Sequence, residues 1–220
     1  MRPLSLDHVA FWVADRRPVV ALCERHLAMH VIDEQERFTL VGADARRGKL
    51  TFFDAEGPRN PGVLRHVALR VSDLAAARAL LPPGEQAALE LGEGIVVRLV
   101  ERETDVDYDL DHVALVTSDP EATASAFEPY GFSRSAPDAV AVSDARLVFE
   151  RGEPDLEGPP VLNHLGLRVD DAEQHRCEAQ ARGLEIESVV DAPNTYAVFL
   201  TGPDGIRVEY VEHKPTFALA

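Results

Sequence analysis

The sequence is poor in several features that mark large functional classes. Only Cys23 and Cys177 are cysteines, so there is no disulfide framework and a reducing, cytoplasmic location is expected. No apolar run approaches the roughly 18 residues that span a bilayer, and the start, MRPLSLDHVAF, lacks a signal-peptide core. The patterns GxGxxG, GxSxG and CxxC and the Walker loop are absent. We therefore expect no membrane partner and none of the chemistries that those motifs serve.

Positive charge is also scarce. The 220 residues include 22 Lys and Arg against 38 Asp and Glu, a formal net charge of −16. Nucleic-acid binding needs clustered Lys and Arg to neutralise phosphates, so a nucleic-acid partner is not expected. A few arginines can still line one pocket, which leaves a small anionic substrate open. The apolar fraction of 45% is typical of a globular protein, with one large domain or two small ones.

A fourfold internal repeat organises the chain. A short alternating run ending in Asp occurs four times: LDHVAFWVAD (6–15), LRHVALRVSD (64–73), LDHVALVTSD (110–119) and LNHLGLRVDD (162–171). Each copy predicts a strand, an Asp N-cap and a helix, over 15–27, 73–81, 119–128 and 171–182. β-rich segments follow each helix. The sequence therefore predicts an α+β protein made of four βαβββ units.

Units of this size bury little apolar surface alone, so we expect them to pair. The acidic stretch RETDVDYD (102–109) is typical of a linker between two similar halves. We therefore predict two tandem paired-module open barrels, one from residues 1–104 and one from 109–213, followed by a tail at 214–220.

The repeated histidines fall on one face of each predicted strand. In the fourth copy Leu165 and Leu167 share the face expected under the helix, which leaves His164 on the opposite, concave face. His112 has the same position in the third copy, and in the last strand Glu209 points to the concave side. Two imidazoles and one carboxylate form the ligand set associated with non-haem Fe(II), which leaves open positions for substrate or dioxygen. The sequence predicts a metal site made of His112, His164 and Glu209.

The first half carries a contrasting pattern. Aligning its last strand with that of the second half places Arg98 where Glu209 stands. Because a guanidinium repels metal ions, His8 and His66 are predicted to lie in a metal-free supporting half.

The whole chain resembles the vicinal oxygen chelate superfamily, on the motifs LDHVALVTSD, LNHLGLRVDD and PDGIRVEYVE. This superfamily includes glyoxalase I, methylmalonyl-CoA epimerase, fosfomycin and bleomycin resistance proteins and type I extradiol dioxygenases. Two tandem pairs with one metal triad are similar to the extradiol enzymes, in which a catechol chelates Fe(II) through both oxygens. The resemblance implies that His112, His164 and Glu209 bind Fe(II). Mn(II), Zn(II), Ni(II) or Co(II) would accept the same donors.

The chain departs from the extradiol pattern near the site. Phe199 stands where those enzymes carry a Tyr, Phe149 and Glu150 stand where they carry an acid–base His, and a further His is missing from DAPNTYAVFL (191–200). Tyr196 could replace it as a catalytic group if the loop is shifted. On the concave face, Phe199 is expected beside the substrate, and Arg168 and Arg207 could clamp a substrate carboxylate or phosphate.

Three functional hypotheses follow. The first is an extradiol-like dioxygenase acting on a catechol-like or enolised small molecule. The second is a metal-dependent lyase or isomerase resembling glyoxalase I or an epimerase, in which the inward carboxylate of Glu150 is a base or fourth ligand. The third is a metal-free protein that binds a small molecule, like the bleomycin-resistance members. A homodimer is common in such folds, but paired units in one chain do not require it.

Overall fold

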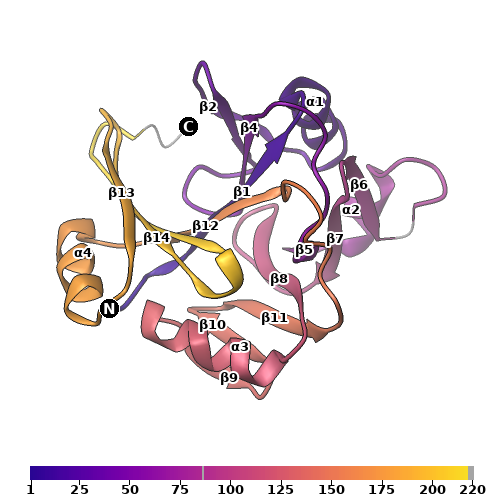
Figure 1. The fold of residues 1–220 in the computed structure, drawn as a ribbon. Coiled ribbons are helices and arrows are strands. Elements are labelled where there is room, and N and C mark those ends of the chain that lie inside the picture. The colour runs from indigo at the N-terminus through magenta and orange to yellow at the C-terminus, as the bar shows by residue number, and fades with distance from the viewer. Residues whose placement is uncertain (86, 218–220) are drawn as a thin grey trace.

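The computed structural model describes residues 1–85 and 87–217 and contains the four predicted units (Figure 1). The first unit consists of β1 (Ser5–Val13), α1 (Arg16–His26), β2 (His30–Glu34), β3 (Phe38–Gly42) and β4 (Lys49–Asp54). The second consists of β5 (Leu64–Val71), α2 (Leu74–Ala79), β6 (Ala88–Gly92) and β7 (Ile95–Glu101). Among the described residues, the second unit therefore has one strand fewer than the first.

The third and fourth units are complete. The third consists of β8 (Asp109–Thr117), α3 (Pro120–Phe127), a 3₁₀ turn (Glu128–Tyr130), β9 (Ser133–Ala136), β10 (Ala139–Val142) and β11 (Ala145–Arg151). The fourth consists of β12 (Leu162–Arg168), α4 (Ala172–Ala181), β13 (Ile186–Asp191), β14 (Thr195–Thr201), a 3₁₀ turn (Pro203–Gly205) and β15 (Arg207–His213). Of the predicted tail, residues 218–220 lie outside the described part.

The repeat predicts the start of each helix correctly. The side chains of four aspartates accept a hydrogen bond from a backbone N–H in the first helical turn, which satisfies a donor that has no partner inside the helix. These N-caps are Asp15, Asp73, Asp119 and Asp171. The alternation of each repeat also has the predicted effect, because the apolar face of each first strand is buried. No described helix combines the length and the apolar character needed to cross a membrane.

The units pair differently from the prediction. An eight-stranded sheet has the order β13-β14-β15-β12-β1-β4-β3-β2, which joins the fourth unit to the first, and a seven-stranded sheet has the order β6-β7-β5-β8-β11-β10-β9, which joins the second to the third. The pairing of units within 1–104 and within 109–213 is therefore wrong. In both sheets the seam is antiparallel, β1 with β12 and β5 with β8. Neither sheet closes into a complete barrel.

The connecting segments explain this arrangement. Residues 102–108 join β7 to β8 inside one sheet and do not separate two domains. The chain passes between the sheets twice, through 55–63 and 152–161, and these crossings lie side by side, since Asn60 pairs with Pro160 and Val161 N–H donates to the Asn60 carbonyl at 2.8 Å. The two crossings are thus fixed to each other at one end of the molecule.

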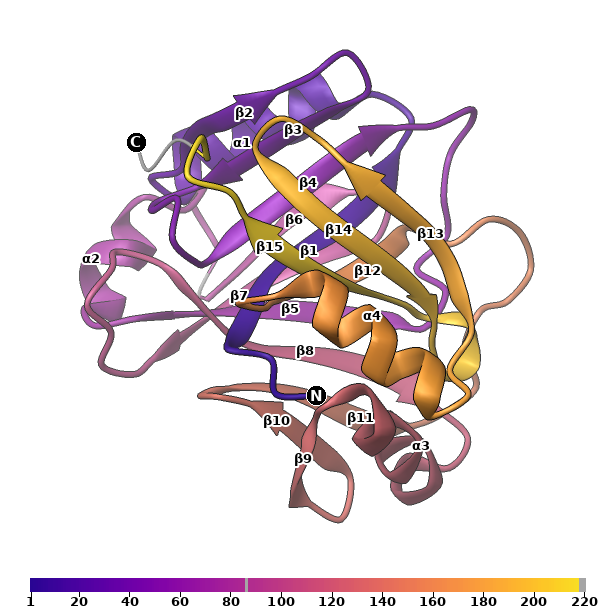
Figure 2. The same ribbon diagram turned by 90° about the vertical axis from the view of Figure 1, so that its left-hand side faces the viewer.

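The sheets share one body of buried side chains. Helices α1 and α4 cover the outer face of the eight-stranded sheet, and α2 and α3 that of the other (Figures 1 and 2). The buried apolar residues form a continuous cluster drawn from all four units. Tyr210 in β15 donates to the Tyr130 carbonyl at 2.8 Å, and Tyr130 donates to the Thr201 carbonyl at 2.8 Å, which ties the third unit to the fourth. The inner faces of the sheets carry the repeated histidines.

The pairing predicts which fragments fold. Residues 62–152 contain the whole seven-stranded sheet, so this fragment should give a dispersed amide NMR spectrum and a cooperative thermal transition. Residues 1–104 contain two units that belong to different sheets, and this fragment should give neither. A folded 1–104 fragment would contradict the observed pairing.

Candidate metal centre

Three ligand-type atoms converge on the inner face of the eight-stranded sheet. His8 Nε2 lies 3.0 Å from His164 Nε2, and Glu209 Oε2 lies 3.0 Å from the first nitrogen and 3.1 Å from the second. All three residues are buried. They form a nearly equilateral triangle of two imidazole nitrogens and one carboxylate oxygen.

Strand register brings the three side chains together. β12 lies between β1 and β15, and Gly166 is paired with His8 on one side and with Glu209 on the other. His164 precedes Gly166 by two residues and therefore projects from the same face. A Cβ at Gly166 would stand 2.3 Å from His8 Cε1, so the missing side chain makes room for the imidazole. Only glycine fits at this position with the ring where it lies.

The hydrogen bonds behind the histidines fix their tautomers. His8 Nδ1 lies 3.0 Å from Asp7 Oδ2, and His164 Nδ1 lies 3.0 Å from Asn163 Oδ1. Arg207 donates to the same Asn163 oxygen at 2.8 Å, which identifies it as an acceptor. Each Nδ1 is thus the protonated donor, and each neutral ring presents the Nε2 lone pair to the triangle.

Three acceptor atoms facing one another require a cation. The buried Glu209 Oε2 has no hydrogen bond of acceptable geometry, despite its short distances to both rings. In the metal-free protein a proton can fill this role. Burial alone would lower the pKa of His8, but the negative charges of Glu209 and Asp7 raise it to about 9. Burial lowers the pKa of His164, so that ring is neutral. Burial would raise the pKa of Glu209, but the contacts of its carboxylate with His164 and His8 hold it well below its usual range.

The triangle also fits a divalent ion. An ion with six ligands at about 2.1–2.2 Å places neighbouring donor atoms about 3.0 Å apart, whereas a tetrahedral ion places them about 3.4 Å apart. The observed separations of 3.0–3.1 Å match three adjacent positions of a six-coordinate ion. Thr51 occupies the position in β4 that corresponds to Glu209, because it pairs with Ala10 just as Glu209 pairs with Gly166. The set therefore contains one carboxylate and not two.

Two groups surround the triangle. The rings of Phe53 and Phe199 lie 6.0 and 5.2 Å from the His164 ring, centroid to centroid. Behind His8, the fully buried ammonium of Lys49 donates to Asp7 Oδ1 and to the Ala45 carbonyl, both at 2.9 Å. The aromatic rings provide a low-polarity side, and the Lys49–Asp7 pair stabilises the orientation of His8.

His112 does not belong to this triangle. It lies in β8 of the seven-stranded sheet, where its Nε2 is 3.1 Å from His66 Nε2. Its place beside His164 and Glu209 is taken by His8, so the prediction of His112 is corrected and the first unit contributes a candidate ligand. The physical reason is the pairing of β1, and not β8, with β12.

The two predicted catalytic residues also lie elsewhere. Glu150 is on β11 of the other sheet, with Oε2 at 3.3 Å from Arg65 Nε. Tyr196 is on the helix-facing side of β14, where its hydroxyl donates to Glu173 on α4 at 3.0 Å. Because successive strand residues alternate in direction, Tyr196 cannot share the face of Phe199. Neither residue contacts the triangle.

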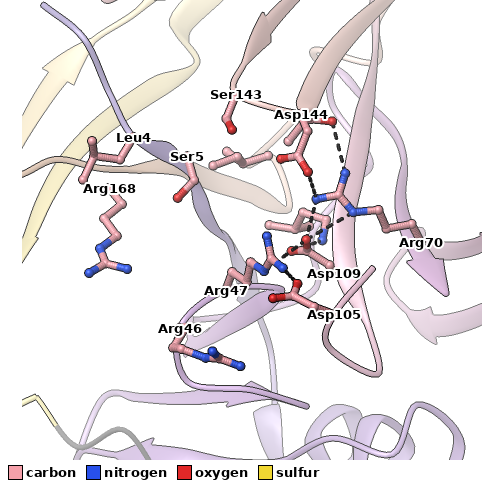
Figure 3. A pocket seen from close by; sticks show the side chains of 13 residues that line it. Leu4, Ser5, Arg46, Arg47, Arg70, Asp105, Asp109, Ser143, Asp144 and Arg168 are labelled. Atoms are coloured by element: carbon pink, nitrogen blue, oxygen red, sulfur yellow. Dashed lines mark hydrogen bonds and ion pairs between the residues drawn. The ribbon is translucent and has the colours of Figure 1, made fainter. Parts of the chain in front are cut away.

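The three predicted substrate-binding residues have different surroundings. Phe199 pairs with Glu209 across the strands and lies beside His164. Arg207 stacks over the Phe199 ring at 4.8 Å and is held by Glu187 at 2.7 Å, in addition to Asn163. Arg168 lines a cavity of about 320 Å³ between the sheets and points away from the ion pairs that Arg47 and Arg70 form there (Figure 3). Of the three, Phe199 and Arg207 adjoin the candidate metal centre.

Asp7 and Asn163, which hold the two histidines, were not predicted from the sequence, although their positions in it are distinctive. Asp7 and Asn163 immediately precede the two histidines, and the equivalent Asp111 precedes His112. A carboxylate or amide in that place can accept from Nδ1 when the strand is locally bulged, and the register shift between Leu6 and His8 provides this bulge. The contact of Lys49 with Asp7 could not be predicted, because the sequence does not show which strand β4 adjoins.

Comparison with known proteins finds solved structures that share the fold of this chain. No protein-family model matches the sequence, and no curated protein matches it. Among solved structures, a candidate dioxygenase from Bacillus subtilis is 18% identical, with a TM-score of 0.78, over 99% of this chain and 87% of its own. Glyoxalase I from Zea mays is 16% identical, with a TM-score of 0.66, over 96% and 92%. The cppA protein from Streptococcus pneumoniae is 11% identical, with a TM-score of 0.65, over 96% and 98%.

These likenesses extend over nearly the whole chain, at identities that speak for the fold alone. They agree with the four repeated units and the two sheets. The chain has the vicinal oxygen chelate fold, the one shared by glyoxalase I and the related dioxygenases.

Proposed function

We propose that this chain is a divalent-metal enzyme, with Fe(II) as the favoured ion, that binds a catechol-like or enolised small molecule through two adjacent oxygens and reacts it with dioxygen. The observation that carries the proposal is the triangle of His8, His164 and Glu209, with edges of 3.0–3.1 Å. Two imidazoles and one carboxylate on one side of an ion are the ligand set of non-haem Fe(II) oxygenases, which keeps positions open for both reactants.

The identity of the residues around the triangle favours an oxygenase over a lyase or isomerase. The glyoxalase-like alternative needs a second carboxylate as base or fourth ligand, and the candidate for it, Glu150, lies on the other sheet beside Arg65. The matching position in β4 is Thr51, whose hydroxyl is neither a strong ligand nor a base at neutral pH. A metal-free binding protein is disfavoured because, without an ion, three buried ligand-type atoms share a single proton and Glu209 Oε2 has no hydrogen bond of acceptable geometry.

The chain's own residues define the rest of the site. A bound ion would lower the pKa of a substrate hydroxyl and hold both reactants together. Asp7 and Asn163 keep the two rings in the tautomer that presents Nε2, and Arg207 keeps Asn163 in place. Phe53 and Phe199 place apolar rings beside His164. Within the described residues, Nη2 of Arg207 has no hydrogen-bond partner, and it is available to an anionic substituent of the substrate.

Dioxygen uptake tests the reaction directly. Protein loaded anaerobically with Fe(II) should consume dioxygen when mixed with a member of a catechol panel, in proportion to the substrate added, and a Glu209→Gln variant should not. Exchange of the proton next to a carbonyl group in ²H₂O, without dioxygen uptake by any catechol, would contradict the oxygenase and favour the isomerase.

Metal content tests the ligand set. The wild-type protein should bind one Fe(II) or Mn(II) per chain, and Glu209→Gln or His8→Asn should weaken binding by more than about 100-fold, since loss of a mere outer-shell partner costs 10–100-fold. The matched control is His112→Asn, which changes the equivalent histidine of the other sheet and should leave the stoichiometry at one. Equilibrium dialysis with elemental analysis measures both.

The variant Gly166→Ala tests the position of the His8 ring without removing any ligand atom. Its Cβ would collide with the His8 ring, so metal binding should fall although all three ligands remain. Full metal binding by Glu209→Gln, or loss of binding by His112→Asn with an unchanged circular dichroism spectrum, would contradict the assignment.

Proton release should accompany metal binding. The pKa of His8 is about 9 in the metal-free protein, so below that pH an ion must displace one proton, and the apparent association constant should rise about tenfold per pH unit before levelling off above about pH 9. The raised pKa also means that protonated His8 stabilises the metal-free fold fully below about pH 6.5 and loses this contribution as the pH rises through 9. Calorimetry in buffers of different ionisation enthalpy counts the protons, and a pH-independent affinity would contradict this prediction.

A further inference from the structure

The carboxylate behind His8 is contacted by polar groups from three strands. Asp7 is buried, and its Oδ2 lies 3.0 Å from His8 Nδ1. Its Oδ1 accepts from Lys49 Nζ at 2.9 Å and lies 3.3 Å from Nε2 of His213, the last residue of β15. The strands β4 and β15 therefore both hold the aspartate that orients a candidate metal ligand.

The seven-stranded sheet carries the same arrangement, so the polar group at the end of β15 is part of the internal repeat. Arg98 occupies the position of Glu209, as the sequence alignment predicted. Four residues further along each strand, Arg102 therefore occupies the position of His213. Arg102 Nη1 donates to Oδ2 of the equivalent aspartate, Asp111, at 2.9 Å. Both sheets thus support this aspartate from the same place.

The two arrangements differ in burial. Arg146 stands at the strand position of Lys49 and also pairs with the aspartate of its own sheet. The side chains of Arg102 and Arg146 are 46% and 44% exposed. Those of Lys49 and His213 are 0% and 7% exposed. The contacts beside the candidate metal centre therefore have a cover that the other set lacks within the described residues.

This cover is the segment that follows β15. The ring of Phe217 stacks on that of His213, with the centroids 4.0 Å apart and the planes at 9°. The ammonium of Lys49 lies over the same ring, 5.0 Å from its centroid, where a cation is attracted to the π face. Phe217 N–H donates to the Lys214 carbonyl at 2.9 Å, so the chain turns back on β15. One aromatic ring thus covers both of the groups that contact Asp7 Oδ1.

Residues 214–217, here called the C-terminal strap, are fixed to the turn between β13 and β14. Lys214 N–H donates to the Asn194 carbonyl at 2.9 Å, and the Thr216 hydroxyl donates to another carbonyl of this turn at 2.6 Å. Asn194 Nδ2 in turn donates to Asp33 on β2 at 3.1 Å. Because β13 and β2 are the outermost strands of the eight-stranded sheet, the strap lies where the two ends of the sheet meet (Figure 2).

We propose that the C-terminal strap positions the metal ligand His8 through Asp7. Phe217 keeps the polar groups around Asp7 buried, and contacts between charged groups are stronger in buried surroundings. The carboxylate then stays on His8 Nδ1, and Nε2 stays turned toward the triangle. The inference rests on the proposed metal centre and adds His213 and Phe217 to it as positioning residues.

Binding of Co(II) measures the effect, since Co(II) accepts the same donors as Fe(II). In equilibrium dialysis, His213→Leu should bind Co(II) about tenfold more weakly, the lower end of the loss expected for a partner outside the ligand set. Phe217→Ala should weaken binding about three- to tenfold by the same route. His213→Gln keeps a side chain that can donate and should retain most of the wild-type affinity.

The chain itself supplies a matched control. Arg102→Leu removes the equivalent group from the seven-stranded sheet, and it should leave Co(II) binding unchanged. Circular dichroism checks that each variant keeps the wild-type fold.

A spectroscopic readout separates positioning from a general loss of stability. In the Co(II)-loaded protein the Nδ1–H protons of His8 and His164 should give two exchangeable, paramagnetically shifted ¹H NMR signals. The signal that Asp7→Asn alters belongs to His8. Phe217→Ala should speed the exchange of this proton with water, whereas the proton of His164, held by Asn163, should keep its wild-type exchange rate.

The outcomes separate this inference from the metal centre. A wild-type protein that binds neither Co(II) nor Fe(II) would overturn both. If the wild-type protein binds one ion, and Phe217→Ala and His213→Leu bind it equally tightly, the strap has no positioning role and the metal centre stands. Equal weakening by Arg102→Leu, or equal acceleration of both histidine protons in Phe217→Ala, would also overturn the inference, because either result shows an effect that is not confined to His8.

Discussion

The antiparallel contact between β1 and β12 is the constraint on which the rest depends. It joins the first and last units of the chain, and its register places His8 opposite Gly166 and one pair away from His164. A shift of this register by one residue would turn the histidines to the helix-covered face. The candidate metal centre thus requires residues nearly the whole chain apart, and neither half of the sequence contains it.

The two inner faces share one scaffold and differ in the charge of the side chain at one position. Both keep a pair of histidines across an antiparallel seam, and both keep an acidic residue behind one of them, Asp7 or Asp111. The difference lies in the third position. Glu209 adds an acceptor that has no hydrogen bond of acceptable geometry, whereas Arg98 adds a donor with no acceptor in the described chain. Since the histidines are common to both faces, their presence alone does not define a metal site.

The sequence predicted the four repeated units, their helix N-caps and the position of the histidines on the inner faces. It also predicted that His164 and Glu209 lie close together. It also predicted the match of Arg98 with Glu209. It could not decide between His8 and His112, because LDHVAFWVAD and LDHVALVTSD are nearly the same strand and either could pair with β12. That choice depends on the short connection 102–108 and on the two crossings that meet at Asn60 and Pro160. Tyr196 was misplaced for a simpler reason, since it lies an odd number of residues from Phe199 and faces α4.

The charge balance of the candidate metal centre argues for the kind of substrate it would favour. The ammonium of Lys49 is fully buried and paired with Asp7, so these two charges cancel close to His8. Glu209 is then the single uncompensated charge among the three ligand residues. A divalent ion bound there would leave one net positive charge among buried ligand residues flanked by the rings of Phe53 and Phe199, where electrostatic attraction is strong. A second carboxylate at Thr51 would cancel that charge. With threonine there, the surplus charge favours a substrate that arrives as, or readily becomes, an oxyanion, such as an ionised diol or an enolate.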